Sequence, residues 1–252
     1  MHEKSFYDMM YAALDKVTKR DSTIKANTDF IAKSILFARG AIAQSDCIID
    51  VGAYKGQVND TTQRYARAFP QNLVYAIEPG NSAFVELAKN VSDLTNVKCH
   101  KVAFGDMECI MKLNVLEADD SSSLCEIDTD ASSKIDQKRF SSVFTKEGTE
   151  DIRVMRLDDF ALENDIRSVV VLKIDTQGFE KKVLAGATKV LERTKIVVVE
   201  MSNHEVYKQS PKYYEIDELL RTAGFHLSDL RPSIYNYDRI YEFDSIYEKK
   251  TP

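Results

Sequence analysis

The sequence predicts an α/β fold built on a mostly parallel sheet, and three observations predict it. The first is the stretch Cys47–Val51, a run rich in β-branched residues that leads into Gly52 and Gly56 and then into a helical pattern over residues 59–69. The second is the stretch Val169–Asp175, whose near-continuous apolar character is typical of a central parallel strand covered on both faces. The third is the alternation of strand and helix patterns along the chain, which favours parallel strands joined by helices.

Taken in order, the apolar periodicity begins with two helices, over residues 5–19 and 29–43. They form an N-terminal helical arm, residues 1–45, ahead of a main domain that spans residues 46–252. Between and after the two strands named above, the patterns predict further strands over residues 73–78, 97–104, 109–116, 152–157, 196–200, 225–230 and 240–243. They also predict helices over residues 82–91, 159–163, 183–191 and 214–223. Asp158 is expected to cap the second of these helices, and Gly224 to end the last one.

Residues 117–150 interrupt this pattern with a polar stretch rich in serine and aspartate. A loop of this length inside a compact domain is usually functional or disordered. We expect a lid or substrate loop here, with a passive insertion as the alternative.

Composition excludes several classes of protein. The chain has 252 residues, of which 44% are hydrophobic, so one large α/β domain with or without an arm can bury a sizeable core. The net charge of −6 argues against a nucleic-acid backbone as the main partner. No stretch approaches eighteen consecutive apolar residues, so no membrane span is expected, and the first residues lack the apolar core of a signal peptide.

The four cysteines, Cys47, Cys99, Cys109 and Cys125, form no C-x-x-C pair. This pattern favours reduced cysteines in a cytoplasmic protein over a zinc site. The oligomeric state is left open by the sequence.

The turn after the first strand carries the strongest functional signal. Glycine adopts positive φ and lets a ligand approach the backbone closely, and the helix that follows presents unpaired N–H groups. The spacing is G-x-x-x-G after Asp50, with Tyr54 where the dinucleotide fingerprint G-x-G-x-x-G has its middle glycine. An acid beside this turn suits a ligand with cationic groups. Glu78 ends the second strand 22 residues after Gly56, near the spacing at which an acid binds ribose hydroxyls.

Ionisable residues also end the central strands. Lys173 and Asp175 close the most apolar strand, Glu200 closes the next, and His204 follows within one short turn. Because the carboxyl ends of neighbouring parallel strands meet at one edge of the sheet, we expect these side chains to converge where α/β folds place their chemistry.

The ordered motifs resemble the FkbM-type S-adenosylmethionine (SAM)-dependent methyltransferases over roughly residues 46–228. The matching motifs are DVGAYKG (50–56), IEP (77–79), VAFGD (102–106), SSSL (121–124), RLDDF (156–160), LKIDTQGFE (172–180), VLAGA (183–187) and VVVE (197–200). Two positions depart from the family's usual wording: Tyr54 replaces an asparagine, and Gln177 replaces the first glutamate of KIDVEG. The resemblance implies a Rossmann-like class I methyltransferase sheet with an antiparallel final strand. It also implies methyl transfer, most often to a hydroxyl oxygen of a sugar, polyketide or related natural product.

With this resemblance, the predicted SAM-binding residues are Asp50, Gly52, Ala53, Tyr54, Gly56, Glu78, Pro79, Ala103, Phe104 and Asp106. For Asp106, a contact with the adenine amino group and a plain turn position remain open. The predicted catalytic residues are Asp175, Glu200, His204 and Lys173, since a hydroxyl acceptor is helped by a general base. A divalent metal bound by the acids, which would activate the hydroxyl, stays open as an alternative, although the spacing requires none. The acceptor is expected to be a small molecule or a glycan.

Two other functions remain as alternatives. An NAD(P)-type Rossmann oxidoreductase shares the element order, but the chain lacks the G-x-G-x-x-G turn and a clear proton-donating pair. A non-catalytic SAM- or nucleotide-binding module keeps the glycine turn but has no need of the acids at the strand ends.

Overall fold

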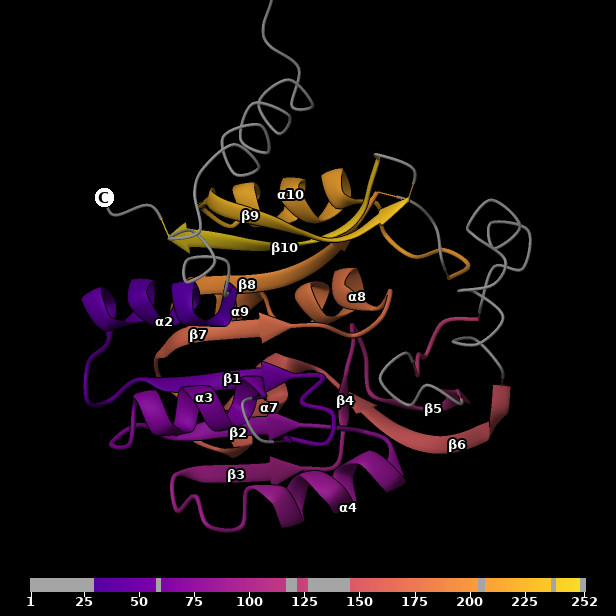
Figure 1. Cartoon of the computed structure of the whole chain (residues 1–252), viewed down its shortest axis with the longest axis horizontal. Helices are drawn as coiled ribbons and strands as arrows, with labels where there is room; N and C mark the ends of the chain where they lie inside the picture. Colours follow the sequence, from indigo (N-terminus) through magenta and orange to yellow (C-terminus); the bar gives the residue numbers. More distant parts are fainter. Residues whose placement is uncertain are drawn as a thin grey trace, which may run out of the picture.

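The protein is described here by a computed structural model that covers residues 30–57, 60–116, 122–126, 146–203, 207–236 and 239–249. Within these residues, seven strands form one sheet in the order β3-β2-β1-β7-β8-β10-β9, and three more form a second sheet in the order β4-β6-β5 (Figure 1). The predicted helix over residues 5–19 lies outside the described part of the chain.

Most helices and strands lie within a few residues of the predicted ranges, but three strands are longer than predicted. They are residues 146–155, which begin inside the stretch 117–150 expected to be a loop, and residues 225–236 and 239–249. The large sheet contains β1 (Cys47–Val51), β2 (Val74–Ile77), β3 (Val97–His100), β7 (Val169–Ile174), β8 (Thr194–Ser202), β9 (Phe225–Asn236) and β10 (Arg239–Lys249). The small sheet contains β4 (Ala103–Phe104), β5 (Cys109–Leu116) and β6 (Lys146–Met155). The helices are α2 (Phe30–Ala41), α3 (Thr61–Ala68), α4 (Asn81–Asn90), α7 (Leu157–Glu163), α8 (Glu180–Ala185), α9 (Thr188–Glu192) and α10 (Tyr213–Thr222).

The large sheet is parallel from β3 to β8 and antiparallel at its other edge. Strand β1 pairs in parallel with β2 and β7, and β7 pairs in parallel with β8. Strand β10 runs antiparallel between β8 and β9, which confirms the antiparallel final strand. Every residue of β1 and β7 is buried, as expected for central strands covered on both faces.

Helices cover both faces of the large sheet. On one face, α2 and α3 bury Phe30, Ile35 and Tyr65 against side chains of β1, β7 and β8. On the other face, α7, α8, α9 and α10 enclose the larger core, which includes Leu172 and Val197. Helix α2 therefore shares a core with the sheet, although it belongs to the predicted arm.

The small sheet lies beyond the carboxyl ends of the parallel strands (Figure 1). The sequence predicts one strand over residues 97–104, but the structure divides it. Val97–His100 pairs with β2 in the large sheet, whereas Ala103 and Phe104 pair with Val154 and Met155 of β6. The strand is divided because its second half pairs with β6, a strand that is distant in sequence, and not with β2.

The predicted helix over residues 183–191 is also divided, into α8 and α9. Gly186 stands at the break, where a Cβ would lie 1.9 Å from the carbonyl oxygen of Gly105. The expected cap role of Asp158 is wrong for α7, since its carboxylate instead accepts hydrogen bonds from the backbone of Lys189 and Val190 in α9. Gly224 does end α10, with φ +88°.

Among the described helices, none combines the length and the apolar character that crossing a membrane requires.

Candidate cofactor and methyl-transfer site

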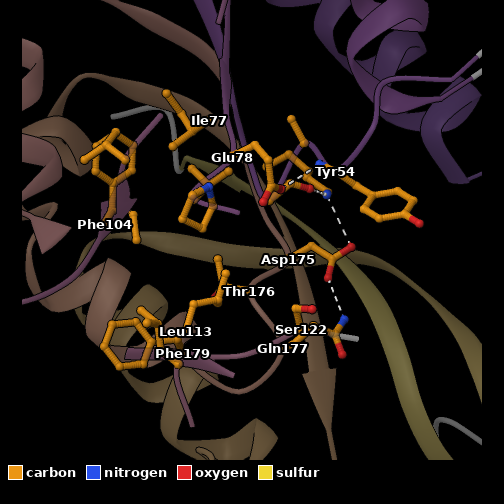
Figure 2. Close-up of a pocket in the computed structure, with 18 of the residues that line it drawn as sticks. Tyr54, Ile77, Glu78, Phe104, Leu113, Ser122, Asp175, Thr176, Gln177 and Phe179 are labelled. Carbon is orange, nitrogen blue, oxygen red and sulfur yellow. Dashed lines mark hydrogen bonds and ion pairs between the residues drawn. The ribbon is translucent and has the colours of Figure 1, made fainter. Parts of the chain in front are cut away.

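A cavity of about 220 Å³ opens at the carboxyl ends of β1, β2 and β7, between the large sheet and the small one. Of the described residues, these line it: Val51, Gly52, Ala53, Tyr54, Asp60, Thr61, Ile77, Glu78, Pro79, Val102, Ala103, Phe104, Leu113, Ser122, Leu124, Lys173, Asp175, Thr176, Gln177 and Phe179. Figure 2 shows the polar side chains of Asp175 and Gln177 on one side and the rings of Phe104 and Phe179 on the other. The cavity thus has a charged end and an apolar end.

The glycine turn forms one wall of the cavity. Gly52 has φ +79°, and a Cβ at this position would lie 1.8 Å from the carbonyl oxygen of Asp175. Tyr54 also has positive φ, at 51°, in a conformation that side chains other than those of glycine and asparagine seldom adopt. The turn therefore needs glycine at Gly52 for packing as well as for conformation.

Glu78 stands at the end of β2 with both carboxylate oxygens tied to the backbone. One accepts a hydrogen bond from the Tyr54 N–H at 3.0 Å, and the other accepts from the Gly80 N–H at 2.8 Å. Burial raises the pKa of this carboxyl to about 7, against the lowering effect of the two N–H groups. Each oxygen keeps a further lone pair for a ligand hydroxyl.

The opposite end of the cavity is apolar. Phe104 comes from β4, Leu113 from β5, and Phe179 directly precedes α8. Figure 2 shows Leu113 and Phe179 side by side below Phe104. These side chains come from three separate segments, so only the tertiary fold forms this wall, and its shape suits a flat aromatic ring.

A buried lysine links the two acids of the first and the central strand. The Lys173 ammonium lies 3.5 Å from the Asp50 carboxylate and 3.2 Å from the Asp175 carboxylate, and it donates to the Gly52 carbonyl at 3.2 Å. Burial alone would lower the pKa of Lys173, but the charges of Asp175 and Asp50 raise it above its usual value. Lys173 in turn holds the pKa of Asp175 below the usual range despite burial. Asp175 is therefore a carboxylate at neutral pH.

Gln177 extends this network toward β8. Its side-chain amide nitrogen donates to Asp175 at 3.0 Å and to Glu200 at 2.9 Å, while its amide oxygen accepts from the Tyr207 hydroxyl at 3.2 Å. Its backbone has φ +52°, and the Ser123 hydroxyl donates to its carbonyl oxygen at 2.5 Å. The turn after β7 is thereby fixed from both sides.

The structure places most predicted cofactor residues on the cavity and three away from it. Gly52, Ala53, Tyr54, Glu78, Pro79, Ala103 and Phe104 line it. Asp50 does not, since it is fully buried and accepts from the Thr62 hydroxyl at 2.6 Å. Gly56 instead gives room to Leu87 of α4, and Asp106 pairs with Lys182 of α8 at 2.7 Å.

The predicted catalytic residues divide in the same way. Lys173 and Asp175 line the cavity, and Glu200 is joined to it through Gln177. His204 lies outside the described residues, and so do most of residues 117–150. The described part of that loop does reach the site, because Ser122 and Leu124 line the cavity.

Sequence reasoning missed several lining residues. Asp60 and Thr61 could have been found, because an acid followed by two threonines signals a helix start, and Asp60 does accept from the Thr61 N–H at 2.9 Å. Nothing in the local sequence indicates that Leu113, Leu124 and Phe179 line a cavity, because apolar residues that face the core occur in the same sequence pattern. Among the described side chains, no group of three or more histidines, cysteines and acids is placed to hold a metal ion.

The sheet order, the antiparallel β10 and a cavity at the ends of β1 and β2 form a Rossmann-like α/β fold with a ligand cavity at the carboxyl edge of its sheet. Residues 50–227 match the family model of the methyltransferase FkbM domain. The chain therefore belongs to this family, and its cofactor is SAM.

The chain is similar to the 2-O-methyltransferase NoeI of Sinorhizobium fredii, with 24% identity over 163 residues, 64% of this chain and 65% of NoeI. It thus spans less than two thirds of that relative's length. Similar solved structures include the FkbM methyltransferase of Methylobacillus flagellatus KT, with TM-score 0.49, 15% identity, and coverage of 83% of this chain and 45% of that one. Another is the SAM-bound magnesium protoporphyrin IX methyltransferase of Synechocystis PCC 6803, with TM-score 0.46, 7% identity, and coverage of 95% and 91%.

Proposed function

We propose that this protein transfers the methyl group of SAM to a hydroxyl oxygen of a sugar, a glycan or a related natural product. The observation that supports it is a single cavity that joins a ribose-type acid, Glu78, to a carboxylate kept ionised by a buried lysine, Asp175. The first is suited to hold the cofactor, and the second is suited to receive the proton of the acceptor.

The cavity residues fit the cofactor. Gly52 and Ala53 of the glycine turn line the cavity, and the absence of a side chain at Gly52 lets a ligand such as the amino-acid end of SAM approach the backbone there. Glu78 has acceptor capacity for the two ribose hydroxyls. The apolar end formed by Phe104, Leu113 and Phe179 suits the adenine ring.

The chemistry asks little of the protein beyond position and proton transfer. SAM supplies a methyl group on a sulfonium, which is already a good leaving group. The chain must align the acceptor oxygen, which is worth several kcal/mol when the geometry is right. Asp175 accepts a hydrogen bond from the acceptor hydroxyl and takes its proton as the new C–O bond forms. Lys173 stays protonated and fixes the Asp175 carboxylate, so it is a positioning residue and not the base.

Two further observations bear on the acceptor atom and on the location of the protein in the cell. The name of the relative, a 2-O-methyltransferase, favours oxygen as the acceptor atom. The free state of Cys47, Cys99, Cys109 and Cys125 supports a location in the reducing cytoplasm. We also keep the division into an arm, residues 1–45, and a methyltransferase domain, residues 46–252, and His204 as a second candidate base.

Thermal shift with SAM, S-adenosylhomocysteine (SAH) and NAD separates the proposed function from an oxidoreductase. Stabilisation by SAM and SAH but not by NAD is expected. Methyl transfer from labelled SAM to a panel of sugars, glycans and hydroxylated metabolites then identifies the acceptor. Label in a carboxylate or nitrogen acceptor alone would contradict transfer to a hydroxyl oxygen, and stabilisation by NAD alone would contradict the proposal as a whole.

A further inference from the structure

A second, smaller cavity lies on the far side of Gln177. Gln177 lines both cavities, so its side chain separates the cofactor cavity from this one. The smaller cavity has a volume of about 20 Å³, and its lining includes Gln177, Glu200, Ser210 and Glu242. A water molecule needs roughly 10–15 Å³ of such space, so the cavity accepts one polar group of that size.

Strand register brings a row of acids to the edge of this cavity. Asp244 is paired with Glu200, and Glu242 with Ser202, in the antiparallel ladder between β10 and β8. Residues directly opposite each other, and those two positions apart, share one face of a sheet, so Glu200, Glu242 and Asp244 point the same way. Asp175 continues β7 on this face, because Lys173 pairs with Val198 in parallel. We call Asp175, Glu200, Glu242 and Asp244 the acidic row.

Positive charge is scarce around the acidic row in the described structure. Lys173 is shared between Asp50 and Asp175, and Arg231 of β9 pairs across from Asp244. Glu200 lies near the charges of Asp175, Glu242, Glu180 and Asp244. It also accepts a hydrogen bond from the side-chain amide of Gln177. Burial first and these neighbours second raise the pKa of Glu200 well above its usual value, and burial raises the pKa of Glu242 to about 7.

A second observation at this cavity indicates a ligand. Ser210 lines the cavity, the residue is only 6% exposed, and its buried hydroxyl oxygen has no hydrogen-bond partner in the described structure. A buried hydroxyl left without a partner costs about 1–3 kcal/mol, so a partner that arrives with a ligand is favoured.

We propose that the cavity beyond Gln177 is an acceptor subsite for a primary ammonium group, so that the methylated molecule carries an amino group near its reacting hydroxyl. This inference rests on the proposed function. An ammonium has three donors, and the cavity offers the two carboxyls of Glu200 and Glu242 and the hydroxyl of Ser210. A neutral hydroxyl offers one donor and no charge. The ammonium of the cofactor is a poor candidate for this cavity, because Gln177 stands between it and the glycine turn.

Isothermal titration calorimetry on the SAH-saturated protein at pH 7 tests the subsite. The probes are 6-amino-6-deoxy-D-glucose, D-glucose and the 6-acetamido derivative, each in phosphate and in HEPES buffer, neither of which contains a primary amine. We expect the amino sugar to bind about tenfold or more tightly than glucose, the scale of one charge-assisted hydrogen bond, and the acetamido sugar to bind no better than glucose. We also expect the amino sugar alone to release protons, because a cation lowers the pKa of the nearby Glu200 and Glu242.

Variants inside and outside the cavity test whether the preference for the amino sugar arises there. Ser210→Ala and Glu242→Gln should each remove most of the preference for the amino sugar, whereas Glu248→Gln, on the same strand β10, should keep it. SAH affinity should stay unchanged in all three. If either Ser210→Ala or Glu242→Gln fails to fold, the other variant and the comparison of probes on the wild-type protein still decide.

Several outcomes would overturn the subsite. These are equal affinity for the amino sugar and glucose, no proton release, competition between the amino sugar and SAH, or displacement of the amino sugar by Mg²⁺ at millimolar concentration. None of these outcomes affects the proposed function while SAH still binds, whereas a protein that does not bind SAH contradicts the proposed function first.

Discussion

The carbonyl oxygen of Asp175 lies 1.8 Å from the point where a Cβ on Gly52 would stand. The two strands β1 and β7 are hydrogen-bonded at this point, since the Asp175 N–H donates to the Val51 carbonyl at 3.0 Å. The glycine turn and the candidate base are therefore in backbone contact. A change at the turn is transmitted directly to Asp175.

We expect Gly52→Ala to lower the free energy of unfolding by about 2–4 kcal/mol, the sum of positive-φ strain and overpacking, and to weaken SAH binding as well. Denaturant titration and calorimetry measure the two effects. Gly40→Ala is the control, because no atom lies within 4 Å of its Cβ position in α2, and it should be neutral or slightly stabilising. Normal stability of Gly52→Ala would contradict the tight contact.

Glu78→Ala should weaken SAH binding by about 1–3 kcal/mol, the scale for losing hydrogen bonds to a charged group. Asp106→Asn should leave it unchanged, because this carboxylate pairs with Lys182 and does not line the cavity. Calorimetry on the two variants separates these roles. If the two variants lost equal SAH affinity, Asp106 would contribute to cofactor binding after all.

SAH binding should depend on pH through Glu78, whose pKa burial raises to about 7. Below that pKa the carboxyl is protonated and has lost acceptor capacity, and above it the carboxylate accepts from ribose hydroxyls. Affinity should therefore rise with pH by up to roughly tenfold per unit below the pKa and level off above it. Titrations between about pH 6 and about pH 8 measure this, and Glu78→Gln should remove the Glu78-linked part of the dependence. An unchanged pH profile in that variant would assign the titration to another group.

Asp175→Asn should lower kcat by roughly 10²–10⁴-fold, the range for a lost general base, with SAH affinity nearly intact. The amide is of similar size and can still receive the Gln177 hydrogen bond at its oxygen, so the turn after β7 should persist. Asp159→Asn, an exposed acid of α7, is the control. If Asp175→Asn turned over at the wild-type rate, Asp175 would not be the general base, and catalysis would depend on substrate positioning or on His204.

Ser123→Ala tests the contact between the segment 122–126 and the turn after β7. The Ser123 hydroxyl is buried and donates to the Gln177 carbonyl at 2.5 Å, so its loss leaves that oxygen without this partner. We expect a loss of about 1–3 kcal/mol in the free energy of unfolding. Ser92→Ala, at an exposed serine, should change it by less than about 0.5 kcal/mol. An equal effect of the two changes would show that the contact is not stabilising.

The sequence alone determined the strands, the glycine turn and the acids at the strand ends. The periods of 2 and 3.6 residues and the stop signals of glycine and proline are local, so β1, β2, β7 and β8 could be placed within a few residues. Gly52, Glu78 and Asp175 were found because each ends or follows a strand, and the carboxyl ends of parallel strands meet at one edge.

Only the tertiary structure decided which of these residues face the cavity and what else surrounds them. Asp50 and Asp106 carry the same carboxyl group as Glu78 and Asp175, but Asp50 is fully buried beside Thr62 and Asp106 pairs with Lys182. Sequence does not reveal which of these groups packing will enclose or which partner each will meet. The apolar wall of Phe104, Leu113 and Phe179 and the bridge made by Gln177 join segments that lie far apart in the chain. Such contacts depend on packing and strand register, because a local pattern fixes which face of an element is apolar but not what that face meets.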